Sequence, residues 1–394
     1  MTAYPSESKG HTGWKSRKAK YLWRESSRVS CSGKETLLSV SRYDGVTPAK
    51  EESRSESLKG YKVVERGDLV INIMLAWMGA LGVSDYDGIV SPAYAVYKPI
   101  VTMLPKFLHY LYRTPEYLAE FAKRSTGVVP SRWRMYGDDF GQVLTWLPPL
   151  PEQEAIVAYL DSATAKIDQA IASEERTIDL LQERKQIIIH QAVTRGLAPN
   201  TPLKLSGIPW LPQIPEKWKV WRLKYLCTMH AGKNLKSEDI TPTGEYPVYG
   251  ANGLRGYFGK HNENGEYLLV GRQGALCGNI HVAWRKFWAT DHALVTKLAG
   301  GLNFRFAFFL FQAMNFNQYA SQTAAQPGLA ASALLQLQTC IPPLPEQQAI
   351  VAHLDAATAK IDHAIEVKRR QIELLRERRE IIIDAAVTGK AKVS

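Results

Sequence analysis

The sequence is poor in cysteine. It has four among 394 residues, and these lie far apart with no CxxC pair and no Cys/His pairing at metal-ligand spacing. We therefore expect reduced, structural thiols and neither a zinc site nor a disulfide framework. The four are Cys31, Cys227, Cys277 and Cys340.

Long hydrophobic runs are also missing. The longest apolar stretch, Leu69 to Val83, contains Asn72 and is shorter than the roughly 20 residues that a helix needs to cross a bilayer. The first residues lack the apolar core of a secretory signal. We expect a cytoplasmic protein with no membrane partner. A hydrophobic share of 45% excludes wholesale disorder.

The motifs of enzymes that act on DNA are not found in the sequence. Residues 253–261 have the wrong glycine spacing for a phosphate loop, and His261 stands where Ser or Thr would hold magnesium. The Pro-Pro pairs at 148–149 and 342–343 lack the Asn or Asp of an adenine methyltransferase loop. No nuclease carboxylate set or Ser/His/Asp arrangement stands out. We predict that this chain has no catalytic residue, no metal site and no cofactor of its own.

An internal repeat is the strongest feature that is present. Residues 147–194 recur without a gap as residues 341–388, with roughly two-thirds of the positions identical. Trp14 recurs more loosely as Trp218. The chain is therefore predicted to consist of two similar halves. We expect globular domains at 1–146 and 218–340, long helices at 147–196 and 341–394, and a semi-rigid proline-rich linker at 197–217.

The repeated segments have the pattern of long amphipathic helices. Pro151 suits a first helical turn, and Gly196 and Gly389 suit C-terminal caps, which gives about 44 residues or roughly 65 Å per helix. We expect the two matching apolar faces to pack on each other as an antiparallel coiled coil related by a pseudo-two-fold axis. The alternative is that each helix docks separately on its own domain. The apolar faces comprise Ile156, Leu160, Ile167, Ile171, Ile178, Leu181 and Ile188, and Ile350, Leu354, Ile361, Ile365, Ile372, Leu375 and Ile382.

The globular parts are predicted to be α/β (α+β) domains. Residues 67–83 and 265–278 have the pattern of apolar strands broken by glycine-rich turns, whereas residues 106–124 and 304–322 have helical spacing. The order of the strands does not follow from the pattern.

The positive charge of the chain belongs to these domains. The net charge is +11, and residues 1–146 hold 21 Lys and Arg against 15 Asp and Glu, while residues 197–340 hold 14 against 7. A basic domain suits a polyanion, and two such domains on one spacer suit a split site on double-stranded DNA.

Several side chains in the basic domains can read bases or contact phosphates. Arg can form a fork with guanine, and Asn or Gln with adenine. For any one of them the alternative is an ordinary solvated charge. The candidates are Lys123, Arg124, Arg132, Arg134 and Tyr136 in the first domain, and Lys233, Asn234, Arg255, Lys260, Arg272, Gln273 and Gln322 in the second.

The chain resembles the specificity subunits of type I restriction-modification systems. The paired PPLPEQ-to-AVT helices and the connector GIPWLPQIPEKWKVWRLKYL carry the resemblance, together with AWMGALGVSDYDGIVSPAYAVYKP and LLVGRQGALCGNI. It implies that each domain is a target recognition domain for one half of a bipartite DNA sequence. It also implies that the helices set the gap and dock two modification subunits, which carry S-adenosylmethionine and methylate adenine. Restriction subunits using ATP and magnesium would join that core.

The resemblance also implies roles for particular residues. Trp77 matches a turn on the DNA side, as do Arg272 and Gln273. The domain-to-helix junctions are candidates for partner contact through Glu152, Gln153, Glu346 and Gln347.

Two other functions stay open at this point. The chain could be a coiled-coil scaffold whose basic domains hold acidic proteins, or an enzyme with an unfamiliar site. A gel shift with genomic DNA separates the first from a DNA reader, and activity of the purified chain alone would indicate the second.

Overall fold

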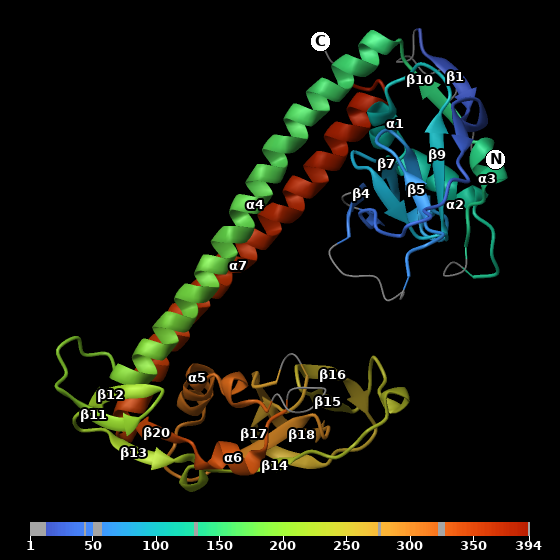
Figure 1. The fold of residues 1–394 in the computed structure, drawn as a ribbon. Coiled ribbons are helices and arrows are strands. Elements are labelled where there is room, and N and C mark those ends of the chain that lie inside the picture. The colour runs from blue at the N-terminus through green and yellow to red at the C-terminus, as the bar shows by residue number, and fades with distance from the viewer. Residues whose placement is uncertain are drawn as a thin grey trace. The chain divides into compact units, whose positions relative to one another are not determined.

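The computed structural model describes residues 13–42, 45–49, 57–129, 133–274, 277–321 and 328–392 (Figure 1). The chain divides into two compact units. The first comprises residues 1–175 and 370–394, and the second comprises residues 176–369. Each long helix therefore contributes one part to each unit.

The two repeated segments form the long helices α4 (Leu150–Arg195) and α7 (Leu344–Val387). Their bounds agree with the predicted start at the Pro-Pro-Leu-Pro turn. Both glycines predicted as caps have left-handed backbone angles, with φ of 75° at Gly196 and 69° at Gly389. The amide of Gly196 donates to the carbonyl of Ala192 at 3.1 Å, which closes the last turn of α4.

The long helices run antiparallel in each unit, as predicted. Ion pairs join Glu175 to Arg376 and Asp168 to Arg379 in the first unit, and Lys185 to Asp362 in the second, so the partner number falls as the α4 number rises. The predicted apolar faces lie inward: Ile167, Ile178, Ile361, Ile365 and Ile372 are all buried. The helices thus pack on each other and not only on the domains.

A pair of short strands marks the same place in both units. In the first, β1 (Lys15–Lys18) pairs antiparallel with β10 (Leu144–Leu147), which leads into α4. In the second, β13 (Lys219–Arg222) pairs in the same way with β20 (Gln338–Ile341), which leads into α7. Trp14 and Trp218 stand directly before β1 and β13 and are buried.

The first domain contains a four-stranded sheet of order β2-β9-β6-β7 and the two-stranded pairs β3-β4 and β5-β8. The helical spacing of 106–124 divides into two helices because Pro115 requires an extended residue before it. The elements are β2 (Trp23–Glu25), β3 (Leu38–Ser41), β4 (Gly45–Pro48), β5 (Lys62–Val64), β6 (Leu69–Asn72), β7 (Leu81–Val83), β8 (Gly88–Val90) and β9 (Tyr94–Pro99), with α1 (Pro105–Leu111), α2 (Pro115–Arg124), α3 (Gly137–Gly141), and the 3-10 helices η1 (Ala19–Tyr21) and η2 (Ala76–Met78).

The second domain contains a six-stranded sheet of order β14-β19-β17-β18-β15-β16, in which only the β15 and β18 pair is parallel. The elements are β14 (Cys227–Ala231), β15 (Tyr246–Gly250), β16 (Gly253–Phe258), β17 (Glu263–Gly271), β18 (Ile280–Ala289) and β19 (Ala293–Leu298), with α5 (Phe304–Met314), α6 (Ala331–Gln336), and the 3-10 helices η4 (Leu223–Tyr225), η5 (Ser237–Asp239) and η6 (Phe316–Tyr319).

The proline-rich segment 197–217 has structure that its composition does not predict. It forms a hairpin of β11 (Leu203–Ile208) and β12 (Leu211–Pro215). Prolines are tolerated here because a two-stranded hairpin has edges on which a missing N–H leaves no partner unpaired. Ile208, Leu211 and Ile214 are buried in the core of the second unit, so this segment packs against the domain that follows it.

Each hydrophobic core extends from a domain onto both long helices. The first-unit core includes Leu160 near the start of α4 and Val387 at the end of α7. The second-unit core includes Leu354 near the start of α7 and Val193 at the end of α4. Each domain is therefore fixed to one helix start and to the other helix end. Within the described residues, no helix is long and apolar enough to cross a membrane.

Candidate nucleic-acid interface

The first domain presents a partly exposed aromatic surface around η2, where two tryptophans are half-buried. The amide of Met135 donates to the carbonyl of Ile73 at 2.9 Å, which holds the segment 133–136 beside η2. The rings of Trp77 and Trp133 meet edge to face with centroids 5.5 Å apart. Met78 is 40% exposed, so apolar area remains open to solvent beside this pair.

The predicted cations of the first domain adjoin this surface. Arg134 is exposed, and its backbone forms a two-way bridge with Thr126 that fixes the chain there. Lys123 is exposed at the end of α2, which packs against η2. Arg124 donates from Nε to Glu120 at 2.6 Å, so its charge is compensated within α2. Tyr136 is 52% exposed.

Three predicted cations of the second domain converge on the turn between β18 and β19. The Lys233 amide donates to the carbonyl of Ala289 at 2.9 Å. Arg272 donates from Nη1 to the carbonyl of Asp291 at 3.2 Å. The side chain of Arg255 and the Thr290 hydroxyl both lie beside Gly250. The sheet topology thus brings together three residues that are far apart in sequence: Arg255 in β16, Lys233 just after β14 and Arg272 just after β17.

The other candidates of the second domain lie on nearby loops. Asn234 is exposed directly after Lys233, and Lys260 is exposed in the turn between β16 and β17. Gln273 is half-buried and forms a backbone bridge with Gly328. Arg132 and Gln322 lie outside the described residues. The DNA contacts of all these residues stay predictions.

The junction residues form internal contacts instead of an open surface. Gln153 is 3% exposed; it accepts from the Leu104 amide at 2.9 Å and donates to the Pro148 carbonyl at 2.8 Å. Gln347, at 1% exposed, accepts from the Asn303 amide at 2.8 Å and donates to the Pro342 carbonyl at 3.0 Å.

Both polar groups of each buried amide are engaged within the chain, and the expected contact of these glutamines with a partner stays a prediction. They fasten each domain to its helix.

The glutamates of the junctions are also engaged, although they are not buried. Trp14 donates from Nε1 to Oε1 of Glu152 at 3.1 Å, and Trp218 donates to Oε2 of Glu346 at 3.0 Å. Each glutamate therefore accepts from the tryptophan that begins its own domain. Their contact with a partner protein stays a prediction.

Residues that the sequence analysis missed complete these joints. Lys106 donates to Asp161 at 2.8 Å, and Arg305 pairs with Asp355 at the equivalent position of the second unit. The two pairs share the same spacing in the sequence. Each cation lies two residues after the residue whose amide bonds the buried glutamine, and each aspartate lies eight residues after that glutamine. Trp133 was missed because nothing local links it to Trp77.

The described parts of the chain contain no group of three or more His, Cys, Asp and Glu side chains that could hold a metal ion. The thiols are not activated either. Burial raises the pKa of Cys227 and of Cys340 to about 12, so neither is a thiolate near neutral pH.

Comparisons with known proteins agree with this architecture. Residues 215–374 match the model of the type I restriction modification DNA specificity domain. A solved structure described as the structural basis of complex assembly and conformational transition of the type I R-M system has a similar fold. Its TM-score is 0.65, at 16% identity over 95% of this chain and 97% of that one.

Curated relatives match over shorter regions. The chain is 40% identical to the type I restriction enzyme EcoprrI specificity subunit of Escherichia coli over 161 residues, which is 40% of each protein. It is 25% identical to the MjaVIII specificity subunit of Methanocaldococcus jannaschii over 274 residues, or 63% of this chain and 62% of that relative. The matches thus span less than two-thirds of either relative. The likeness to type I restriction-modification DNA specificity proteins thus rests, in sequence, chiefly on residues 215–374.

Proposed function

We propose that this chain is the DNA sequence-specificity subunit of a type I restriction-modification complex. Each domain reads one half of a bipartite site on double-stranded DNA. The helices set the unspecified gap and dock two modification subunits, and restriction subunits join that complex.

The duplicated joint is the observation that carries this proposal. A tryptophan-glutamate contact, a buried glutamine and a cation-aspartate pair recur at equivalent positions in both units. Each domain is therefore held in one orientation on the helix that follows it. A fixed orientation of each domain matters for reading a split site, because the spacing of the two half-sites along the duplex is fixed and each domain must contact its own half-site.

The exposed chemistry of the domains favours DNA over an acidic protein. Aromatic edges beside cations in the first domain, and clustered Lys and Arg in the second, can combine phosphate contacts with base contacts. The names of the relatives also favour this function over a coiled-coil scaffold.

We further propose that the chain is not catalytic. Its sequence has no methyltransferase, ATP-binding or nuclease motif, so methylation with S-adenosylmethionine and cleavage with ATP and magnesium would belong to the partner subunits. Such a complex would act on DNA in the cytoplasm.

Methylation mapping tests the proposal. The chain is expressed with its modification partner in a host, and methylated adenines are mapped across the genome. We expect a split motif with a fixed gap. Replacing residues 1–146 with the corresponding domain of another family member should change one half of that motif and leave the other half unchanged.

Two results would contradict the proposal: methylation without a motif, or a motif that changes in both halves after the swap. A purified chain that methylates or cuts DNA by itself would overturn the non-catalytic assignment.

A further inference from the structure

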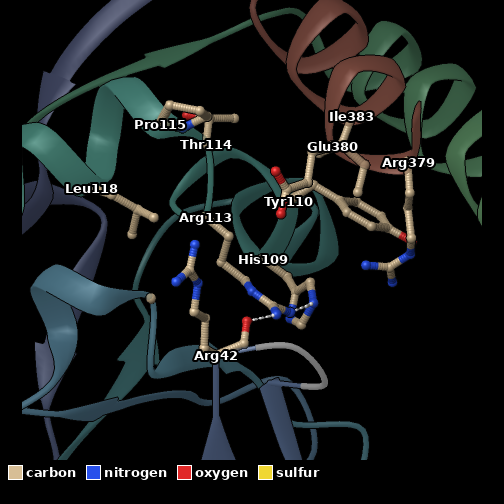
Figure 2. A pocket seen from close by; sticks show the side chains of 11 residues that line it. Arg42, His109, Tyr110, Arg113, Thr114, Pro115, Leu118, Arg379, Glu380 and Ile383 are labelled. Carbon is tan, nitrogen blue, oxygen red and sulfur yellow. Dashed lines mark hydrogen bonds between the residues drawn. The ribbon is translucent and has the colours of Figure 1, made fainter. Parts of the chain in front are cut away.

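A cavity of about 190 Å³ lies in the first unit, between the first domain and the last turns of α7 (Figure 2). The domain contributes Arg42, which follows β3, and His109 and Arg113 of α1 and its C-terminal end. Arg379 and Glu380 of α7 form the opposite wall. Figure 2 shows these α7 side chains projecting toward the group of Arg42, His109 and Arg113.

The hydrogen bonds of His109 are incomplete in this cavity. The Val83 amide donates to Nδ1 at 3.2 Å, and Nη1 of Arg113 lies 2.9 Å from Nε2. A neutral imidazole has only one acceptor nitrogen. Since both neighbours are donors, one of the two contacts sets a donor against a donor. An additional acceptor at this place would remove the conflict.

The Nε atom of Arg379 is a further donor in this cavity without a hydrogen-bond acceptor. This atom is buried, and the nearest carboxylate is that of Asp168 at 3.4 Å. Buried donors are normally paired, because leaving one unmade costs about 1–3 kcal/mol. Nη2 of Arg113 donates to the Arg42 carbonyl, so Nε of Arg379 is the donor of these groups that stands without a hydrogen bond.

Burial and the neighbouring positive charges act in the same direction on His109. Three guanidinium groups and one carboxylate, that of Glu380, line the cavity. Desolvation, and then the positive charges of Arg113, Lys106 and Arg379, lower the pKa of His109 to about 3. His109 is therefore neutral at physiological pH.

The repeat provides an internal comparison. The equivalent place in the second unit is a cavity of about 540 Å³ lined by amides and imidazoles, including Gln186 and Gln312. The domains can be aligned by matching Lys106 with Arg305, and this alignment makes Gln312 the equivalent of Arg113. The helix repeat makes Gln186 the equivalent of Glu380. Among the described residues, no Lys or Arg lines this second cavity. This cavity therefore forms without arginines in its described lining, and those that line the first cavity need another explanation.

We propose that the first-unit cavity is a binding site for a single phosphate-sized oxyanion, held by Arg42, Arg113 and Arg379. The volume is below the roughly 300–1,000 Å³ of sites for drug-sized ligands, so the ligand is a small group. Guanidinium groups match the tetrahedral oxygens of phosphate by paired N–H donors.

Two sources of this group share the same chemistry: free inorganic phosphate and a phosphodiester of bound DNA. In either case the anion links the domain to α7, because Arg42 and Arg113 belong to one and Arg379 to the other. The site goes beyond the proposed function, since binding of free phosphate requires no DNA recognition.

Titration calorimetry with inorganic phosphate on the full chain, against chloride at equal ionic strength, tests the site. We expect saturable binding that weakens at least tenfold in Arg379→Gln and in Arg42→Gln, and strengthens in Glu380→Gln. Arg379→Lys should retain part of the affinity.

Lys185→Gln is the matched control, because Lys185 occupies the position of Arg379 in the other helix. It should bind phosphate as the unmodified chain does. Circular dichroism verifies that each variant is folded.

DNA binding by the complete complex distinguishes the two sources. If DNA supplies the phosphate, Arg379→Gln weakens DNA binding and inorganic phosphate competes with DNA beyond the effect of ionic strength. If free phosphate is the ligand, DNA affinity is the same with and without saturating phosphate. Absence of phosphate binding, or equal binding by the unmodified chain and Arg379→Gln with no change in DNA affinity, overturns the proposal.

Discussion

Nε1 of Trp218 lies 3.0 Å from Oε2 of Glu346, and the contact recurs between Trp14 and Glu152 at 3.1 Å. Each pair joins the first residues of a domain to the first turn of the helix that follows it. A negative charge in the first turn also complements the positive end of the helix dipole. The contact thus places a helix start and a domain start together in both halves of the chain.

The buried glutamines should contribute more to stability than the contacts at the surface. Gln347→Ala removes the partners of the Asn303 amide and the Pro342 carbonyl, so we expect a loss of about 2–4 kcal/mol in the free energy of unfolding. Gln348→Ala, at the exposed neighbouring position, should change it by less than about 0.5 kcal/mol. Urea unfolding of the full chain measures both. Equal effects of the two substitutions would show that the amide does not fasten the joint.

The long helices should be held together by their apolar seam rather than by their ion pairs. Ile365→Ala removes a buried side chain and should cost about 2–5 kcal/mol. Lys185→Ala breaks a pair whose aspartate, Asp362, is 55% exposed, and should cost at most about 1 kcal/mol. Denaturation at low and high salt tests this, because salt weakens only the second contribution. A larger loss for Lys185→Ala would refute the assignment.

Arg134 should contact DNA phosphate if the first domain reads DNA through its aromatic surface. Arg134→Gln should then weaken binding of the complex to all sequences alike and lower the slope of log affinity against log salt by about 0.9. Lys18→Gln is the control, since Lys18 is exposed on β1 at the joint and bonds Gln142. Fluorescence anisotropy across a salt series gives the slopes. A slope that falls equally in both variants would show that position 134 has no special role.

Local patterns predicted the elements that depend on local sequence. The long helices follow from an apolar repeat at three, four and seven residues, and their antiparallel pairing follows from two equal faces in one chain. Trp14 and Trp218 recur in the sequence, and both are buried. The helical spacing of 106–124 and 304–322 also agrees with α1, α2 and α5, although the break between α1 and α2 was not predicted.

Features that depend on distant residues were not predictable in the same way. The order of the six-stranded sheet rests on pairings such as β14 with β19, which no local pattern encodes. Gln153 and Gln347 were expected to contact a partner protein, and their burial could not be predicted because the amides that they accept from lie 49 and 44 residues away. The hairpin at 203–215 was not predicted because its prolines favour an irregular linker. Lys233, Arg255 and Arg272 lie near one turn only because the strands of the sheet pair in this order.

The depressed pKa of His109 should make the stability of the chain depend on pH. The native state keeps His109 neutral down to a pKa of about 3, while the unfolded chain takes up a proton near its ordinary value of 6.5. Between these values the unfolded state binds one more proton, so stability falls as pH falls, by about 1.4 kcal/mol per pH unit from this group. Above pH 6.5 this group does not lower the stability of the native state, and below pH 6.5 the stability falls progressively.

Unfolding free energies at pH 7 and pH 5 measure the effect. His109→Asn should be less stable than the unmodified chain at pH 7 but should lose less on acidification, so the difference between the two chains narrows toward pH 5. His353→Gln is the control, because His353 is exposed on α7 and should leave the pH dependence unchanged. If the His109 variant and the unmodified chain kept a constant difference between pH 7 and pH 5, His109 would have to be charged in the native state at pH 5. The depression of its pKa by burial and by the charges of Arg113 and Arg379 would then be wrong.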